Sequence, residues 1–444
     1  IIIATFLLSG CSNSALNSEA GMEQAASAKT SNYTSIALSD NEILVDNKII
    51  SEEKTAAVYA GNDIVYYEEG KDETYGEGKK KDSHSKEEAD KHTVITITSP
   101  GTYKVSGKIS FGQIAVDLGK DSREDEKAVV NLILDNVEIN CNVAPAIVVY
   151  NAFECGNKKE EDAKPVIDTS GAGFNLILAG DSENIINGSY VAKIYEEGTK
   201  KKDIENGKAK KKYKFDASID SLVSFNIDSE ENGRLIVNAE NEGISSGLHM
   251  TVNGGEIIIN AADDSINTNK DNVSVFTMNG GTVVCNSGSG KEGDGIDSNG
   301  YIVINGGFVT ACANSDSMDS GIDSDKGIYI NGGTVFGSGN MYDKISADSG
   351  QLFMVMEFDK KIKEDDLILI TDHVDNPVTA FRAVNDYHIA VYSSQELVEG
   401  IYHIYQVSDV TGDLEENVYK TINDYNNPVL LNTYQLDGVG IYDD

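Results

Sequence analysis

The acidic residues of this chain gather in one part of the sequence, where their spacing is suited to binding a metal ion. Asp297 and Asp323 hold the same place in two copies of a Gly-Ile-Asp motif. Two carboxylates held close together repel, and one takes up a proton unless a cation lies between them. Oxygen ligands beside flexible glycines suit Ca²⁺, which binds six to eight oxygens. We therefore expect calcium at these carboxylates: Asp263, Asp264, Asp294, Asp297, Asp319 and Asp323. The alternative is a solvated row that only aids solubility.

A sequence repeat must position these carboxylates. The tripeptide Asn-Gly-Gly starts at Asn253, Asn279, Asn305 and Asn331, so each copy begins 26 residues after the last. Apolar residues alternate on both sides of each copy, which predicts a strand, a turn and a second strand. The isoleucine of the Gly-Ile-Asp motif marks a third strand. Three short strands per coil of about 26 residues predict an all-β fold, a right-handed parallel β-helix.

The Asn-Gly-Gly tripeptide itself is expected to have a structural role. Its glycines can adopt the positive φ that a turn requires. Its asparagine can stack on the asparagines of neighbouring coils and form an amide ladder along the stack.

The repeat and its less regular neighbours predict the domain boundaries. We expect the β-helix over residues 33–340 and a small β domain that caps its end over residues 341–444, because an open stack of strands needs its edge covered. Two charged insertions, at 71–91 and 199–214, interrupt the pattern. Both are expected to be solvated loops.

The first residues predict an export signal. Residues 1–10 contain an apolar run that is too short to span a membrane and fits the end of a signal peptide. The string Leu-Ser-Gly-Cys at its end resembles a bacterial lipobox, which would make Cys11 the lipidated first residue of the mature protein. Residues 11–32 then form a polar tether. The alternative is an ordinary secretory signal with a chance cysteine. We expect an extracellular protein, lipid-anchored at the bacterial cell membrane or surface.

The charge of the chain excludes some partners. Its net charge is −37, from 73 acidic and 36 basic residues. Nucleic acid is therefore not an expected partner, and the membrane is contacted through the anchor only. We expect a monomer.

A family resemblance agrees with these patterns. Residues 95–107, residues 112–117 and the Gly-Asp-Gly-Ile-Asp-Ser-Asn-Gly string at 293–300 look like the bacterial carbohydrate-binding domain-containing lipoproteins. These are parallel β-helix proteins with a pectate-lyase-like fold, whose members bind cellulose and pectic polysaccharide. The resemblance implies a polysaccharide partner and bound calcium at the aspartates of this string and its neighbours.

Neither set of catalytic residues known from related polysaccharide-cleaving enzymes is complete. A lyase needs a basic residue beside calcium, for which Arg234, Lys270 and Lys326 are the candidates. The Gly-His-Gly and Arg-x-Lys motifs of polygalacturonase-like hydrolases do not occur in the sequence, and His249 is expected to be an ordinary surface or edge histidine. We therefore expect a binding protein and not an enzyme. A calcium-dependent polysaccharide lyase and a structural surface adhesin remain alternatives.

Aromatic residues on the outward positions of the repeat are the candidates for carbohydrate binding. Sugars commonly stack on flat aromatic rings, and this chain has no tryptophan. Tyr301, Tyr329 and Phe336 could form a partial platform. Equally, they could lie beneath the C-terminal segment.

Overall fold

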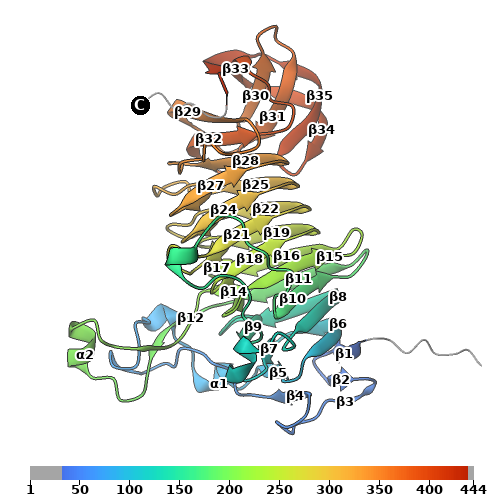
Figure 1. The fold of residues 1–444 in the computed structure, drawn as a ribbon, viewed down its shortest axis with the longest axis vertical. Coiled ribbons are helices and arrows are strands. Elements are labelled where there is room, and N and C mark those ends of the chain that lie inside the picture. Colours follow the sequence, from blue (N-terminus) through green and yellow to red (C-terminus); the bar gives the residue numbers. More distant parts are fainter. Residues whose placement is uncertain (1–32, 439–444) are drawn as a thin grey trace, which may run out of the picture. The chain divides into compact units, whose positions relative to one another are not determined.

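Parallel strands make up most of the fold. The computed structural model describes residues 33–438. Within them, strands of successive coils pair side by side into three parallel ladders, stacked one coil above the next (Figure 1). The protein is therefore all-β with large, mostly parallel sheets, as the repeat predicts.

The three ladders have the following strands. The first ladder contains β1 (Thr34–Leu38), β6 (Gly101–Ile109), β8 (Val130–Cys141), β10 (Phe174–Leu178), β15 (Phe225–Ser229), β18 (His249–Val252), β21 (Val275–Met278), β24 (Tyr301–Ile304) and β27 (Gly327–Ile330). The second continues from the end of β8 through β11 (Glu183–Gly188), β16 (Arg234–Ala239), β19 (Glu256–Ala261), β22 (Thr282–Asn286), β25 (Phe308–Cys312) and β28 (Thr334–Gly339). The third contains β5 (Thr93–Ile97), β7 (Gly112–Asp117), β9 (Ile147–Asn151), β14 (Ala217–Ser221), β17 (Glu242–Ser246), β20 (Ile266–Thr268), β23 (Ile296–Ser298) and β26 (Ile322–Ser324).

Like residues stack on like residues in the core, as the repeat predicts. Ile257 pairs in register with Val283, Val283 with Val309, and Val309 with Val335. All four side chains are fully buried. Each coil therefore buries its apolar face only because the next coil covers it, which is the physical reason for the repeat.

The asparagines of the tripeptide form the expected amide ladder. The Nδ2 of Asn331 donates to the Oδ1 of Asn305 at 2.9 Å, Asn305 donates to Asn279 at 3.0 Å, and Asn279 donates to Asn253 at 2.8 Å. Asn253 ends the ladder on the carboxylate of Asp228. The prediction of a structural role for these asparagines is confirmed.

The second glycine of the tripeptide is the one that the turn requires. Gly281 has φ +85°, and a Cβ there would lie 2.6 Å from the carbonyl oxygen of Gly255. We expect Gly281→Ala to lower the free energy of unfolding by about 1–3 kcal/mol. Gly254→Ala is the matched control, because the nearest atom to its Cβ lies 3.8 Å away. Denaturant midpoints of the two variants measure the difference, and equal midpoints would contradict this account of the turn.

The C-terminal segment covers the last coil. It contains β29 (Phe353–Ile362) and β32 (Tyr387–Ser393), and β32 pairs antiparallel with both β28 and β29. A further antiparallel sheet follows, made of β30 (Leu367–Asp372), β31 (Pro377–Arg382), β33 (Gly400–Val407), β34 (Asp409–Glu415), β35 (Val418–Asn426) and β36 (Val429–Leu436). The pairing of β28 with β32 thus joins segments on both sides of the boundary predicted at residue 340.

Most residues of the two charged insertions are exposed, as expected, but the segments contain short regular elements and not only loops. Residues 199–214 include α2 (Lys201–Glu205) and most of β13 (Lys211–Phe215), and β13 pairs antiparallel with β12 (Val191–Tyr195). Residues 71–91 include the 3-10 turn η1 (Lys80–Asp82) and the short helix α1 (Lys86–Ala89). Tyr75 and Tyr213 of these segments pack against the buried core, and they supply apolar surface that a count of charges does not reveal.

Short elements complete the chain. They are β2 (Leu44–Val45), β3 (Lys48–Ile49), β4 (Val58–Gly61) and the 3-10 turns η2 (Lys120–Glu124) and η3 (Glu160–Asp162). β4 pairs antiparallel with β5 and so covers the other end of the third ladder.

Candidate functional site

Carboxylates from consecutive coils lie in register beside the third ladder. Asp297 pairs with Asp323 on one side and with Asn267 on the other. Three residues earlier in their coils, Asp264 and Asp294 are also neighbours, because the main-chain N–H of Asp294 donates to the Oδ1 of Asp264 at 2.7 Å. These residues and Glu242 of the preceding coil are called the acidic row here.

Burial and mutual repulsion hold protons on the acidic row when no cation is bound. Burial raises the pKa of Asp294 to about 9, and the charges of Asp323 and Asp264 act in the same direction. Burial and the nearby carboxylates likewise raise the pKa of Asp297 to about 8 and that of Asp264 to about 7. The pKa of Asp323 rises to about 6, and that of Glu242 is also well above its usual value. Full ionisation of the row would therefore create negative charge that no neighbouring cation in the described part of the fold balances.

Two buried oxygen atoms in the row have no hydrogen-bond donor. They are the Oε2 of Glu242, whose side chain is 6% exposed, and the Oδ1 of Asn267, which is 7% exposed. The Nδ2 of Asn267 donates to Glu242 at 3.3 Å and to Asp264 at 3.2 Å, so the three side chains lie together. A buried acceptor without a donor is costly and uncommon. A cation or a proton beside either oxygen would satisfy it.

Asp263 and Asp319 flank the row. Burial and the nearby Glu292 raise the pKa of Asp263 to about 6. Asp319 accepts from the main-chain N–H of Gly293 at 2.6 Å and from the hydroxyl of Ser317, so main-chain and hydroxyl donors hold it in the next coil. In the part of the chain that the structure describes, no three His, Cys, Asp or Glu side chains are placed so that they alone could hold a metal ion.

The sequence repeat does not predict three further charged residues that lie near the row. Asp220 pairs in register with Ser245, and Ser245 pairs with Asn267 of the next coil. Burial raises the pKa of Asp220 to about 7. Asp343 lies at the end of the row that contains Asp323, where it accepts from the main-chain N–H of Ser324 at 2.8 Å. Lys214 forms an ion pair with Asp216 at 2.6 Å. Burial alone would lower the pKa of Lys214, but Asp216 and nearby carboxylates outweigh it and raise that pKa.

The basic residues considered for a lyase do not occupy the row. Arg234 lies on β16 in the second ladder, where it forms ion pairs with Glu183 at 3.2 Å and with Glu256 at 3.1 Å. Lys270 and Lys326 are exposed. The charges that act on Asp297 are those of four carboxylates: Asp264, Asp323, Asp325 and Asp343.

His249 is buried, whereas a surface or edge position was expected. Its Nε2 lies 2.9 Å from the carbonyl oxygen of Asn157, and its Nδ1 accepts from the main-chain N–H of Val275 at 3.1 Å. A neutral ring with its proton on Nε2 satisfies both contacts. Burial lowers the pKa of His249 to about 4, so this histidine has a structural role.

The predicted aromatic platform is only partly present. Tyr301 and Tyr329 are partly exposed on the same side of the first ladder, with ring centroids 6.4 Å apart. The prediction that Phe336 belongs to the platform is wrong. Phe336 is 1% exposed, and its ring packs on that of Phe381 with centroids 4.2 Å apart. It points outward from its own coil as the alternation predicts, but the C-terminal sheet covers it. A sugar has no access to its ring.

Cys11, the signal peptide and the tether lie outside the described residues. Among those that are described, no helix is long and apolar enough to cross a membrane. The remaining cysteines are buried free thiols: Cys141, Cys155, Cys285 and Cys312.

Comparisons with known proteins address the family. No curated protein matches the chain. Among solved structures, a polysaccharide lyase-like protein from C. thermocellum, studied as a gadolinium derivative, is similar at 18% identity. The overlap covers 72% of this chain and 92% of that one with a TM-score of 0.40, which is too low to bear on the fold or function of this chain.

A protein-family model gives the stronger result. The model of the carbohydrate-binding domain-containing proteins matches residues 91–172 and 183–349. The two segments span more than half of the chain and contain the acidic row and both exposed tyrosines. The chain belongs to the family of carbohydrate-binding domain-containing proteins.

Proposed function

We propose that this chain is a right-handed parallel β-helix that binds a cellulose- or pectin-like polysaccharide at the bacterial cell surface without cleaving it. It acts as a monomer, is held by a lipid on Cys11, and carries calcium in the acidic row. Membership of a carbohydrate-binding family supports the polysaccharide partner.

The match to the carbohydrate-binding family carries the proposal of a binding protein. The positions of the basic residues agree with it. A lyase must remove a proton from its substrate with a basic group that is itself unprotonated at the working pH. Arg234 forms ion pairs with Glu183 and Glu256, away from the acidic row, and Lys270 and Lys326 are exposed. Lys214, beside the row, forms an ion pair with Asp216 at 2.6 Å, and such a pair favours the protonated form of a lysine.

The donor chemistry of the acidic row suits calcium. Carboxylate and amide oxygens are hard ligands of the kind that Ca²⁺ prefers. Glu242 and Asn267 each have a buried oxygen without a donor, and Asp264 lies beside both. These three residues would hold one ion, and Asp294, Asp297 and Asp323 of the next coils would need main-chain or amide oxygens beside them to hold another. The ion would supply positive charge and fix neighbouring coils to one another.

Retention on insoluble polysaccharide tests the function. We expect the protein to sediment with cellulose or pectate in calcium and to release no unsaturated sugar, measured by ultraviolet absorbance. A Tyr301→Ala, Tyr329→Ala double variant is expected to bind about tenfold more weakly if these rings meet the polymer. Unsaturated products would instead establish the lyase. If the protein is not retained on polysaccharide and releases no unsaturated sugar, the structural surface adhesin becomes the favoured function.

A further inference from the structure

The two charged insertions fold against each other beside the ladders, and most of their buried apolar residues join the core of the ladders. We call residues 64–92 and 190–215 the insertion lobe. The main-chain N–H of Tyr195 donates to the carbonyl of Tyr75 at 2.8 Å, and that of Glu77 donates to the carbonyl of Lys193 at 2.9 Å. The carboxylate of Glu77 also accepts from the hydroxyl of Tyr195 at 2.7 Å and from Lys193 at 2.8 Å. Segments more than a hundred residues apart are thus joined through main chain and side chains.

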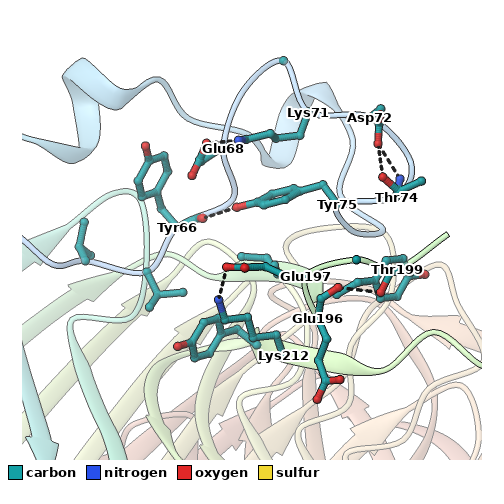
Figure 2. A pocket seen from close by; sticks show the side chains of 17 residues that line it. Tyr66, Glu68, Lys71, Asp72, Thr74, Tyr75, Glu196, Glu197, Thr199 and Lys212 are labelled. Atoms are coloured by element: carbon teal, nitrogen blue, oxygen red, sulfur yellow. Dashed lines mark hydrogen bonds and ion pairs between the residues drawn. The ribbon is translucent and has the colours of Figure 1, made fainter.

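A cleft lies between the two halves of the insertion lobe (Figure 2). Its volume is about 730 Å³, which falls within the range of sites that hold small ligands. Tyrosines are the notable lining residues: Tyr66, Tyr75, Tyr195 and Tyr213. Of these, Tyr66, Tyr75 and Tyr213 are partly exposed. In a chain without tryptophan, this is a concentration of aromatic surface.

The charges of the cleft are paired with one another. Lys71 forms an ion pair with Glu68 at 2.7 Å, and Lys212 lies 3.7 Å from Glu197. In Figure 2 the ring of Tyr75 lies between these two pairs.

The two other carboxylates of the cleft have different surroundings. Asp72 accepts from the N–H and the hydroxyl of Thr74. The carboxylate of Glu196 points away from Tyr75 (Figure 2). Lys71 also lies over the ring of Tyr75, 5.3 Å from its centroid, and Lys212 over that of Tyr213 at 5.4 Å, so each of these rings has one face toward a lysine. The cleft therefore offers a ligand tyrosine rings and hydrogen-bonding groups, and its lysines are paired with carboxylates.

We infer that the cleft of the insertion lobe binds an uncharged oligosaccharide. Apolar faces of sugar rings stack on tyrosines, as they do on other aromatic rings. Glu68 and Glu197 offer acceptors for sugar hydroxyl groups while they remain paired with their lysines. A polyuronate would need a free cation, and the four carboxylates that line the cleft would repel it. The inference rests on the proposed polysaccharide function and adds a second contact, away from the repeat.

Calorimetry with soluble sugars tests the inference on the full chain. The probes are cellohexaose, xylohexaose, mannohexaose and hexagalacturonate. We expect at least one neutral hexasaccharide to bind and hexagalacturonate not to bind. Tyr213→Ala is expected to lower the affinity about tenfold or more, whereas Tyr213→Phe keeps the ring and should stay within about threefold of the unaltered chain. Tyr425→Ala, on β35 of the C-terminal sheet, is the control: this tyrosine is partly exposed and belongs neither to the cleft nor to the pair of tyrosines on the first ladder, so the affinity should stay unchanged.

The outcomes separate this inference from the proposed function. Equal affinity of Tyr213→Ala and the unaltered chain would overturn the cleft assignment, as would binding of hexagalacturonate alone. Retention on insoluble polysaccharide without binding of any soluble hexasaccharide would also overturn the cleft assignment. In all three cases the proposed function would stand. If neither soluble nor insoluble polysaccharide binds, the proposed function itself fails. Should Tyr213→Ala not fold, loss of binding in Tyr66→Ala together with its retention in Tyr66→Phe would carry the same test, because Tyr66 also lines the cleft and is partly exposed.

Discussion

At pH 8, the protein is expected to unfold at a clearly higher temperature in millimolar calcium than in EDTA. The acidic row places buried carboxylates in register, and burial raises the pKa of Asp294 to about 9 and that of Asp297 to about 8. Ionising them without a cation costs free energy, which calcium would offset. An ion present at about a thousand times its dissociation constant stabilises the folded state by roughly 4 kcal/mol. Differential scanning calorimetry should show an increase of about 5 °C or more.

The pH dependence without calcium gives an independent check. A carboxyl whose pKa is raised by folding stabilises the folded state fully below its unfolded pKa, and that contribution is lost as the pH rises through the folded pKa. For the acidic row the folded values lie between about 6 and about 9, so stability in EDTA should fall from pH 5 to pH 9. His249 acts in the opposite direction below pH 6.5, since its folded pKa is about 4. One histidine offsets the change of only one of the four carboxyls, so stability in EDTA is still expected to fall as the pH rises above about 5.

Two results would contradict this account. Identical unfolding temperatures in calcium and EDTA at pH 8 would exclude calcium from the row. A flat pH profile in EDTA would show that the carboxylates ionise freely. Magnesium is the control ion, because it demands a tighter octahedral shell and is expected to stabilise the protein less.

The sequence repeat predicted the part of the site that shares its period. Asp297 and Asp323 follow the same motif one coil apart, and the structure pairs them in register. Glu242 was not predicted, because the coils between it and Asp294 are not all of one length. The hydrogen bond from Asp294 to Asp264 spans 30 residues, whereas the equivalent asparagines of the amide ladder are 26 apart. A fixed period cannot align residues across such a change.

Long-range packing explains the other differences. Alternation placed Phe336 on the outside of its coil, and no local pattern reveals that Phe381, from a later sheet, covers it. Charge composition predicted a loop at 199–214, yet Lys201 of this segment forms an ion pair with Glu73 at 2.7 Å. Both contacts join residues far apart in the chain, and periodicity and composition report only on neighbours. The lipid anchor and the bound calcium stay predictions.

Asp294 is the residue at which removal of one charge should have the largest effect. Its Oδ1 accepts from the main-chain N–H of Ser320 at 2.6 Å, and an asparagine keeps this acceptor. Asp294→Asn therefore removes the ionisable group, which the fold must keep protonated above the pKa of an unfolded aspartate, without removing the hydrogen bond. In EDTA at pH 8, we expect this variant to be more stable than the unaltered chain by about 1–3 kcal/mol. In calcium we expect its stabilisation to be mostly lost, because a carboxylate ligand is gone.

Asp316→Asn is the matched control for this experiment. Asp316 belongs to the same acidic segment but is exposed, so its replacement should leave both the stability in EDTA and the response to calcium unchanged. Denaturant unfolding of the three proteins, each with calcium and with EDTA, measures both effects. If Asp294→Asn is less stable than the unaltered chain in EDTA, the charge of Asp294 is compensated by a partner within the fold. If the variant responds fully to calcium, Asp294 is not a ligand, and the ion must bind at Glu242 and Asn267 instead. The opposite signs expected in EDTA and in calcium distinguish a metal ligand from a residue that merely stabilises the coil.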